Sequence, residues 1–289
     1  MMPSRFSGPS GKTLIRLPGR LNLSDLVLRK VRTLFLSDVH LGTKGCQADL
    51  LLDFLKHVEA ETIYLVGDII DGWRLKAAWY WPQAHNDVVQ KLLRKARKGI
   101  RIIYVPGNHD EFLRDYVGQS FGGVDLHEEV IHETADGRRL LILHGDKYDV
   151  VVNNVKWLTH LGDWAYDAAI GLNIAIGWIR RRLGMPYWSF SGWSKQKVKR
   201  AVSYIGDFER AVVNDARKFD VHGVVCGHIH APVIRQMDDC LYLNTGDWVD
   251  SCSALVEEFD GTLELMRWTS LRAVNTPVED KREELRSAA

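Results

Sequence analysis

Short apolar runs that end in polar residues alternate with amphipathic segments through the first half of the chain. The runs at residues 31–38, 61–68 and 99–110 have the length and β-branched content of buried strands. Between them, residues 48–58 and 83–98 repeat apolar positions at the spacing of helices. This βαβαβ alternation predicts a sheet with helices on its faces and functional loops at the carboxyl ends of its strands.

The later part of the chain is mostly β in pattern, with strand-like segments at 138–146, 221–230, 240–248, 253–259 and 263–268. The last two flank Asp260-Gly261, which predicts a hairpin. Residues 1–30 are expected to form a loosely ordered extension, and residues 271–289 a polar C-terminal tail.

Residues 153–205 have a different character from their surroundings. Apolar residues from Trp157 to Leu183 recur three or four positions apart, which predicts a long helix or a helical hairpin. The segment carries eight basic and two acidic residues and half of the ten tryptophans. Such a segment suits an amphiphilic anionic ligand, although a helical pair with a solvated basic face explains the composition equally well. We therefore predict a core of residues 31–152 and 206–270 that this helical insertion interrupts.

Composition narrows the class of protein. The chain has 289 residues, 46% of them hydrophobic and 26% charged, which excludes a disordered or fibrous protein. A net charge of +1 provides no overall field for holding nucleic acid. The four cysteines form no CxxC pair, and the first thirty residues contain no secretory signal, so we expect a cytoplasmic protein. The most apolar stretch, residues 164–179, is too short to span a membrane but is able to lie on one.

Five segments at the ends of predicted strands close with residues of the types that bind metals. They are SDVH with Asp38 and His40, GDIID with Asp68 and Asp71, GNHD with Asn108, His109 and Asp110, HGD with His144 and Asp146, and GHIH with His228 and His230. One histidine near a strand end is usually structural, but five such segments favour a shared site. Carboxylate, amide and imidazole ligands together suit Mn²⁺, Fe or Zn²⁺. Alternate side chains of an extended segment face the same side, so Asp38 and His40 can converge on one ion.

The order DxH, GDxxD, GNHD, HG and GHxH resembles the calcineurin-like metallophosphoesterase superfamily over residues 38–230. The resemblance implies an α/β sandwich of two mixed β-sheets flanked by helices, with the helical cap inserted at 153–205. It also implies two divalent transition-metal ions, with Mn²⁺ expected in preference to Fe or Zn²⁺. The implied ligands are Asp38, His40, Asp68 and His230 for one ion, and Asp68, Asn108, His144 and His228 for the other, with Asp68 bridging.

The same resemblance implies the catalytic residues. His109 is expected to stabilise the transition state or to protonate the leaving group. Asp110 is expected to complete the site by orienting His109. Asp71 is expected to contact the ligand side chains rather than the metal ions. A loop cap or turn is the alternative role for these two carboxylates.

Within that superfamily the chain resembles the UDP-2,3-diacylglucosamine pyrophosphohydrolases of lipid A biosynthesis, on SDVHLG, YLVGDIIDGW, HGD with its helical insertion, and GHIHAP. The resemblance implies hydrolysis of UDP-2,3-diacylglucosamine to 2,3-diacylglucosamine 1-phosphate (lipid X) and UMP. It implies acyl chains in the cap and peripheral contact with the cytoplasmic face of the inner membrane. The candidate substrate contacts are Arg74, Trp79, Asn86, Arg180, Arg181, Lys195 and Lys199.

One position departs from the pattern of the best-studied members, which have Arg after the metal-binding Asn where this chain has His109. His at that position is typical of general phosphomonoesterases and phosphodiesterases in the superfamily. A metal-dependent phosphodiesterase or phosphatase acting on another lipid or a soluble nucleotide therefore stays open, as does an inactive scaffold with the same fold. A nuclease is the least favoured alternative, because the charge outside the cap is balanced.

Overall fold

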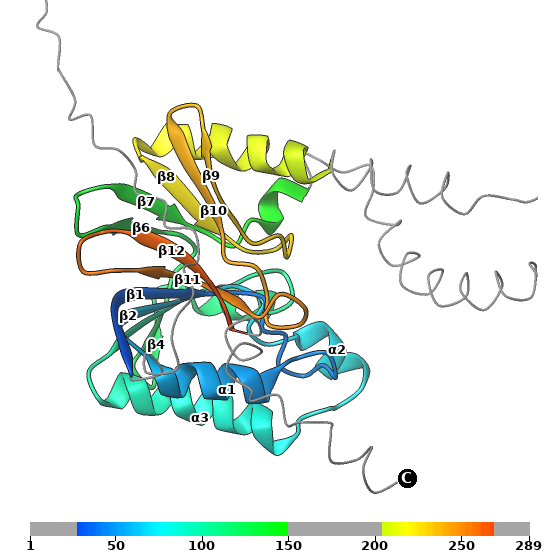
Figure 1. The fold of residues 1–289 in the computed structure, drawn as a ribbon. Helices are drawn as coiled ribbons and strands as arrows, with labels where there is room; N and C mark the ends of the chain where they lie inside the picture. The colour runs from blue at the N-terminus through cyan, green and yellow to red at the C-terminus, as the bar shows by residue number, and fades with distance from the viewer. Residues whose placement is uncertain (1–27, 150–203, 269–289) are drawn as a thin grey trace, which may run out of the picture. The chain divides into compact units, whose positions relative to one another are not determined.

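The computed structural model of the chain describes residues 28–149 and 204–268. Contacts divide the chain into two units, residues 1–144 with 221–289, and residues 145–220. The first unit contains two β-sheets that lie face to face (Figure 1). The predicted class, two mixed sheets flanked by helices, is confirmed.

The larger sheet has seven strands in the order β12-β11-β1-β2-β3-β5-β4. Their bounds are β1 (Arg29–Leu36), β2 (Val58–Val66), β3 (Arg101–Val105), β4 (Ser120–Phe121), β5 (Val124–Leu126), β11 (Ser253–Glu257) and β12 (Leu263–Arg267). Strands β1, β2, β3 and β5 are parallel, so their carboxyl ends meet at one edge. The predicted hairpin of β11 and β12 adds to β1 in the antiparallel direction.

The smaller sheet has five strands in the order β6-β7-β8-β10-β9. Their bounds are β6 (Val130–Glu133), β7 (Arg139–Ile142), β8 (Gly223–Cys226), β9 (Val233–Met237) and β10 (Cys240–Asn244). Strands β7, β8 and β10 are parallel, and the two outer strands are antiparallel to their neighbours.

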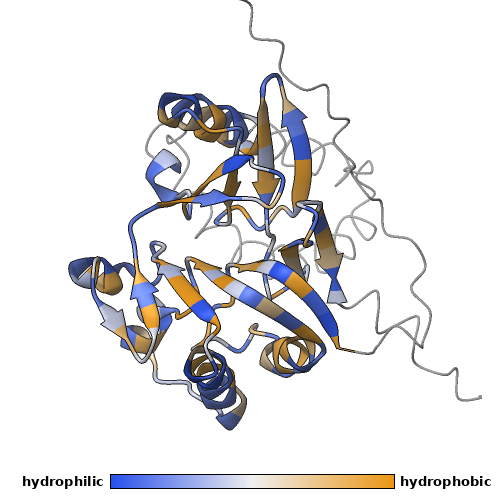
Figure 2. Cartoon of the chain, turned by 90° about the vertical axis from the view of Figure 1, so that its left-hand side faces the viewer, coloured by the Kyte–Doolittle hydropathy of each residue, from blue (hydrophilic) through white to orange (hydrophobic). Residues whose placement is uncertain are grey.

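The period-two pattern of the strands divides the core between the two faces of the larger sheet. Leu34 and Leu36 of β1 pack in the cluster that includes helices α1 (Ala48–His57) and α3 (Gln83–Arg97), whereas Phe35 packs in the cluster shared with the smaller sheet. Figure 2 shows orange, hydrophobic positions interspersed with blue or pale ones along the strands of both sheets. The helices and the smaller sheet therefore cover opposite faces.

Several elements differ from the prediction. The first helix ends at His57, and Val58 instead begins β2, where it pairs with Arg29 of β1. The strand predicted at 221–230 is shorter, because residues after Cys226 leave the extended conformation. Helix α2 (Gly72–Ala77) and strands β4, β5 and β6 were too short for a periodic signal.

Parts of the predicted organisation lie outside the described residues, namely the cap at 153–205 apart from residues 204 and 205, nearly all of the N-terminal extension, and the tail. Among the helices in the described ranges, none is long and apolar enough to cross a membrane.

Glu257 in β11 is the centre of a buried polar network that joins the two sheets. Its carboxylate accepts hydrogen bonds from Thr33 Oγ1 at 2.6 Å and from the Ala135 N–H at 2.8 Å. Nε2 of His132, in the smaller sheet, lies 2.8 Å away, and Arg32 pairs with the carboxylate at 2.6 Å. Burial raises the pKa of the Glu257 carboxyl, but the hydrogen bonds outweigh burial, so its pKa lies below the ordinary 4.5.

We expect Glu257→Ala to lower the free energy of unfolding by about 3 kcal/mol, because Arg32 and His132 lose their shared partner. Glu133→Ala, at an exposed position of β6, is the matched control and should change stability by less than about 0.5 kcal/mol. Urea denaturation followed by tryptophan fluorescence measures both.

The pH dependence of the same difference has a defined sign. Since the folded pKa of Glu257 lies below the unfolded one, its stabilisation is complete above the unfolded value and is lost as the pH falls through the folded value. Wild type and Glu257→Ala should therefore converge in stability below pH 4.5. Equal stabilities at pH 7 would contradict the proposed role of the network.

Candidate metal centre

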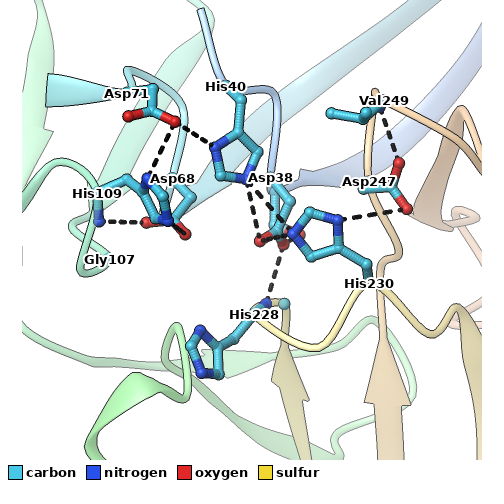
Figure 3. Close-up of polar contacts among 12 residues, drawn as sticks. Asp38, His40, Asp68, Asp71, Gly107, His109, His228, His230, Asp247 and Val249 are labelled. Atoms are coloured by element: carbon cyan, nitrogen blue, oxygen red, sulfur yellow. Dashed lines mark hydrogen bonds and ion pairs between the residues drawn. The ribbon is translucent and has the colours of Figure 1, made fainter. Parts of the chain in front are cut away.

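Loops that follow strands of both sheets place the predicted ligands together. Asp38, Asp68 and Asn108 come after β1, β2 and β3, and their carboxyl ends share one edge of the larger sheet. His144 and His228 come after β7 and β8 of the smaller sheet. The loops interlock through backbone hydrogen bonds, from Asp38 N to Gly67 O at 3.0 Å and from Gly227 N to His144 O at 3.1 Å. Figure 3 shows the converging side chains.

Three groups of side chains in the described residues are close enough to hold a metal ion. They are Asp38 with His40 and His230, Asp68 with His144 and His228, and Asp71 with His40 and His109. In the first group, His230 Nε2 lies 3.2 Å from Asp38 Oδ1 and 3.4 Å from His40 Nε2. In the second, His144 Nε2 lies 3.3 Å from Asp68 Oδ2.

Hydrogen bonds behind His40 and His144, and an ion pair behind His109, orient the imidazoles toward the centre. Nδ1 of His144 lies 2.9 Å from the Val66 carbonyl oxygen, which requires the proton on Nδ1 and leaves Nε2 as the lone-pair nitrogen. Oδ2 of Asp71 lies 3.2 Å from His40 Nδ1 and 3.0 Å from His109 Nδ1. Asp71 also accepts the N–H of Arg74 at the start of α2, so one carboxylate orients two rings and caps a helix.

Five of the predicted ligands have left-handed backbone conformations: Asp38, His40, Asp68, His228 and His230, with φ between 50° and 69°. Non-glycine residues rarely adopt such angles, although Asp and His tolerate them better than most. Each costs on the order of 1 kcal/mol or more, and such residues cluster where function requires them. The strands end abruptly here because the backbone turns each donor into the centre.

The donor set fits a bound cation. Within the described residues, no hydrogen bond reaches the buried atoms Asp38 Oδ1, whose ion-pair partner is His230, and Asn108 Oδ1. Buried oxygen atoms with incomplete hydrogen bonding are costly unless a cation supplies the missing interaction. Oxygen and imidazole donors together suit a divalent transition metal, and Figure 3 shows them aimed at one region.

The ionisation of the site supports the same conclusion. Burial raises the pKa of Asp38 and of Asp68, but His230 and His144 outweigh it, so both carboxyl pKa values lie below the ordinary range. Burial lowers the pKa of His230, yet Asp38 raises it to about 9. An ionised Asp38 beside a protonated His230 forms a site in which a cation can replace the proton.

Two glycines allow this close packing. A Cβ on Gly107 would collide with Asp68 Oδ1 and lie 2.7 Å from His144 Nε2. A Cβ on Gly227 would collide with Asp38 Oδ2. Any side chain at these positions would displace a ligand.

The contacts of Asp110 resemble those of a loop cap, the alternative role predicted for this residue. It is fully buried, and its carboxylate accepts hydrogen bonds from the backbone N–H groups of Gly107 and Ile69 at 2.6 and 2.8 Å and from the Tyr104 hydroxyl. Within the described residues it makes no contact with the His109 side chain, which Asp71 holds instead. Burial and then Asp68 raise the pKa of Asp110. Asp110 therefore joins the loops that carry Asp68 and Asn108.

Of the predicted substrate contacts, Arg180, Arg181, Lys195 and Lys199 lie outside the described residues. Arg74 is exposed and Asn86 is half-buried in α3, and in the described part of the chain neither side chain contacts a ligand group. Trp79 is 78% exposed, and its ring neighbour among the described residues is Trp81, at 6.2 Å between centroids.

Sequence reasoning missed Trp73 and did not single out Asp247. The Trp73 ring lies 4.3 Å from that of His109 between centroids, and its indole nitrogen donates to Glu111 at 3.3 Å. Asp247, in the loop after β10, lies 3.8 Å from His230 Nδ1. In the sequence, Trp73 cannot be distinguished from an ordinary exposed aromatic residue, and Asp247 cannot be distinguished from an ordinary turn residue.

The two sheets and the convergent His, Asp and Asn donors at their carboxyl ends define a metal-dependent hydrolase. The sequence profile described as Calcineurin-like phosphoesterase matches residues 31–232, and the chain belongs to that family.

Relatives with assigned names are similar over most of their length. A UDP-2,3-diacylglucosamine hydrolase of Photorhabdus laumondii is 23% identical over 222 residues, 71% of this chain and 84% of the relative. Those of Porphyromonas gingivalis and Neisseria gonorrhoeae are 26% and 27% identical, each over 79% of this chain, and cover 94% and 95% of the relatives. The family and these names support phosphohydrolase activity.

We expect Gly107→Ala to weaken metal binding at least about 10-fold, since the added methyl group displaces Asp68 and His144. The control is Gly206→Ala, where a Cβ meets nothing within 4 Å in the described residues. Metal content after dialysis against a fixed Mn²⁺ concentration, measured by mass spectrometry, tests this. Wild-type loading of Gly107→Ala would contradict the assignment.

Trp73→Ala is expected to lower kcat about 10-fold with a smaller effect on KM, because His109 loses the ring that holds it. The substrate is the simple diester bis(p-nitrophenyl) phosphate. Trp79→Ala, assayed with the same substrate, is the control for loss of an exposed indole. Recovery of kcat in Trp73→Phe would identify stacking as the cause, and unchanged kcat in Trp73→Ala would exclude it.

Proposed function

We propose that the chain is a two-metal phosphohydrolase that cleaves the phosphoanhydride of UDP-2,3-diacylglucosamine to 2,3-diacylglucosamine 1-phosphate and UMP. The observation that carries the proposal is the position of Asp68 between two ligand groups. Asp68 Oδ2 lies 3.3 Å from His144 Nε2 of its own group and 4.0 Å from Nε2 of His109, which belongs to the group of His40 and Asp71. Such a carboxylate is suited to bridge two ions.

The proposed ligands are Asp38, His40, Asp68 and His230 for one ion and Asp68, Asn108, His144 and His228 for the other. Two bound cations, of which we favour Mn²⁺, would neutralise phosphate charge and lower the pKa of a bound water. Asn108 aims an amide oxygen without a hydrogen-bond partner among the described residues, consistent with a ligand role.

His109 is the proposed catalytic residue beside the metals. A quarter of its side chain is exposed, whereas the Asp68 and Asp71 side chains are nearly inaccessible. Asp71 holds Nδ1 at 3.0 Å, so the other ring nitrogen is available to a phosphate oxygen or to the leaving group. Trp73 and Asp71 fix the ring, and Asp110 acts as a positioning residue.

The substrate proposal is supported by the names of the relatives and by the exposed aromatic residues Trp73 and Trp79 after the second ligand loop. An acylated substrate requires apolar surface, which the predicted cap at 153–205 also offers in its composition. Function at the cytoplasmic face of the inner membrane follows from the same proposal.

A second candidate is a phosphodiesterase or phosphatase acting on a soluble nucleotide or another lipid. The observation in its favour is His109 itself, which stands where the best-studied lipid A enzymes have Arg. In the structure this residue is an imidazole held against carboxylates, which can transfer a proton at neutral pH more readily than a guanidinium.

The shared chemistry is tested with Asp68→Asn and the simple diester bis(p-nitrophenyl) phosphate in the presence of Mn²⁺. Removing the bridging carboxylate should lower kcat/KM by more than about 100-fold, with the fold retained. Asp115→Asn, an exposed carboxylate outside the site, is the control and should match wild type. Wild-type turnover by Asp68→Asn would refute the two-metal site.

The substrate is tested by comparing wild-type kcat/KM for UDP-2,3-diacylglucosamine with that for unacylated UDP-N-acetylglucosamine and for bis(p-nitrophenyl) phosphate, with products identified by mass spectrometry. We expect the acylated substrate to be preferred at least about 100-fold and to yield UMP. Equal or better turnover of the unacylated compounds would favour the second candidate.

A further inference from the structure

A pocket on the helical side of the larger sheet lies far from the metal ligands in the fold. It has a volume of about 270 Å³, and its lining residues are Leu28, Leu55, Lys56, Glu59, Lys91, Arg94, Lys95, Lys98 and Ile100. Residues 56–59 lead into β2, and Ile100 precedes β3. The pocket is therefore at the edge where these parallel strands begin, opposite the edge where Asp68 and Asn108 follow them.

The lining combines positive charge with apolar surface. Five of the nine residues are cationic, one is a carboxylate, and Leu28, Leu55 and Ile100 supply the apolar part. The positive side chains come from α1 and from α3 with the residue that follows it, Lys98, and the two helices pack side by side at the bottom of Figure 1. Tertiary packing thus gathers charges that are about 40 positions apart in sequence.

Although Glu59 also lines the pocket, no ion pair within the described residues neutralises these cations. In the described residues none of the five forms an ion pair: the ammonium of Lys95 donates to the Val58 carbonyl at 3.3 Å, and Arg94 donates to the Gln90 side chain at 3.3 Å. Lys95 is only 8% exposed. A buried ammonium with one neutral acceptor retains donors for a further ligand.

Electrostatic repulsion within the cluster is visible at Lys91. Burial lowers the pKa of Lys91, and Lys56, Arg94 and Lys98 lower it further. Burial likewise lowers the pKa of Lys95, and Lys91 lowers it further, against the opposing effect of Glu59. A bound anion would relieve this repulsion.

A helix C-terminus attracts cations, and this explains part of the cluster. Arg94, Lys95 and Arg97 lie in the last turn of α3, where the helix dipole favours them. Lys91 precedes that turn, and Lys56 belongs to another helix, yet both line the same cavity. The helix dipole does not account for a concave site with an apolar floor.

We propose that this pocket is a second anion site, which binds the phosphate group of a small ester while its carbon part rests on Leu28, Leu55 and Ile100. Lysines bind phosphate as compact charges, and several around one cavity suit a group with two negative charges. The volume suits a phosphate with a short carbon chain or the head of a phospholipid, and both sources present the same group. The site is independent of the proposed hydrolysis.

The test uses the full-length, metal-loaded protein and two variants that each reverse two charges. Lys91→Glu/Lys98→Glu alters the pocket, and Arg97→Glu/Arg101→Glu alters exposed cations nearby that do not line it. Glycerol 3-phosphate is titrated while backbone amide resonances of residues 55–59 and 91–100 are followed by NMR. Hydrolysis of bis(p-nitrophenyl) phosphate at the wild-type rate shows that a variant is folded. If Lys91→Glu/Lys98→Glu does not fold, Lys91→Gln/Lys98→Gln is used in its place.

In a parallel measurement, the proteins are sedimented with vesicles of phosphatidylcholine alone or mixed equally with phosphatidylglycerol. Local amide shifts that saturate in wild type and control, but require at least about 10-fold more glycerol 3-phosphate in the pocket variant, would establish a site for soluble esters. A 10-fold loss of binding to the mixed vesicles, confined to the pocket variant, would establish a lipid headgroup as the ligand. If neither the local shifts nor vesicle binding distinguishes the pocket variant from the control, the proposal is wrong.

Discussion

The burial of two ionised carboxylates at one edge is the constraint on which the arrangement of the loops depends. Asp38 is inaccessible and Asp68 is 2% exposed, so neither is stabilised by solvent. Charge in such a place requires compensation of several kcal/mol. Imidazoles from the smaller sheet provide part of it, and backbone N–H groups provide more, as His228 N does for Asp38 at 3.0 Å and His109 N for Asp68 at 2.8 Å. The sheets therefore meet around the charges that they jointly neutralise.

The left-handed backbone conformations at the metal centre cost free energy, and contacts elsewhere in the structure compensate for this cost. Ligand residues in left-handed conformations are held by hydrogen bonds between loops, such as His40 N to Asp68 O at 2.9 Å and Trp248 N to Asp38 O at 3.0 Å. The residues proposed to bind the metals are thus fixed by backbone hydrogen bonds as well as by packing. A metal ion entering this site would meet donors already in position, which reduces the ordering needed for binding.

Much of this could be predicted from sequence, because parallel strands bring their carboxyl ends to one edge and each ligand follows a strand directly. Asp38, Asp68 and Asn108 required only that β1, β2 and β3 be recognised. Contacts that depend on the path of loops could not be predicted in the same way. Trp73 reaches His109 across 36 positions, and Glu257 reaches His132 across 125, with no periodic signal to pair them. Asp110 has the sequence context of a catalytic residue, and only its hydrogen bonds to Gly107 and Ile69 reveal its task.

Asp71 has a consequence for how such a protein can diversify. The residue orients His40 and His109 and also caps the start of α2. The first turn of α2 is therefore fixed in position relative to the metal centre. Residues 78–82 between α2 and α3 belong to none of the described strands. Trp81 packs against the core, but exposed residues such as Trp79 can vary at small cost to the ligands. New substrate preferences can therefore evolve in this short connection while the inorganic chemistry is inherited unchanged.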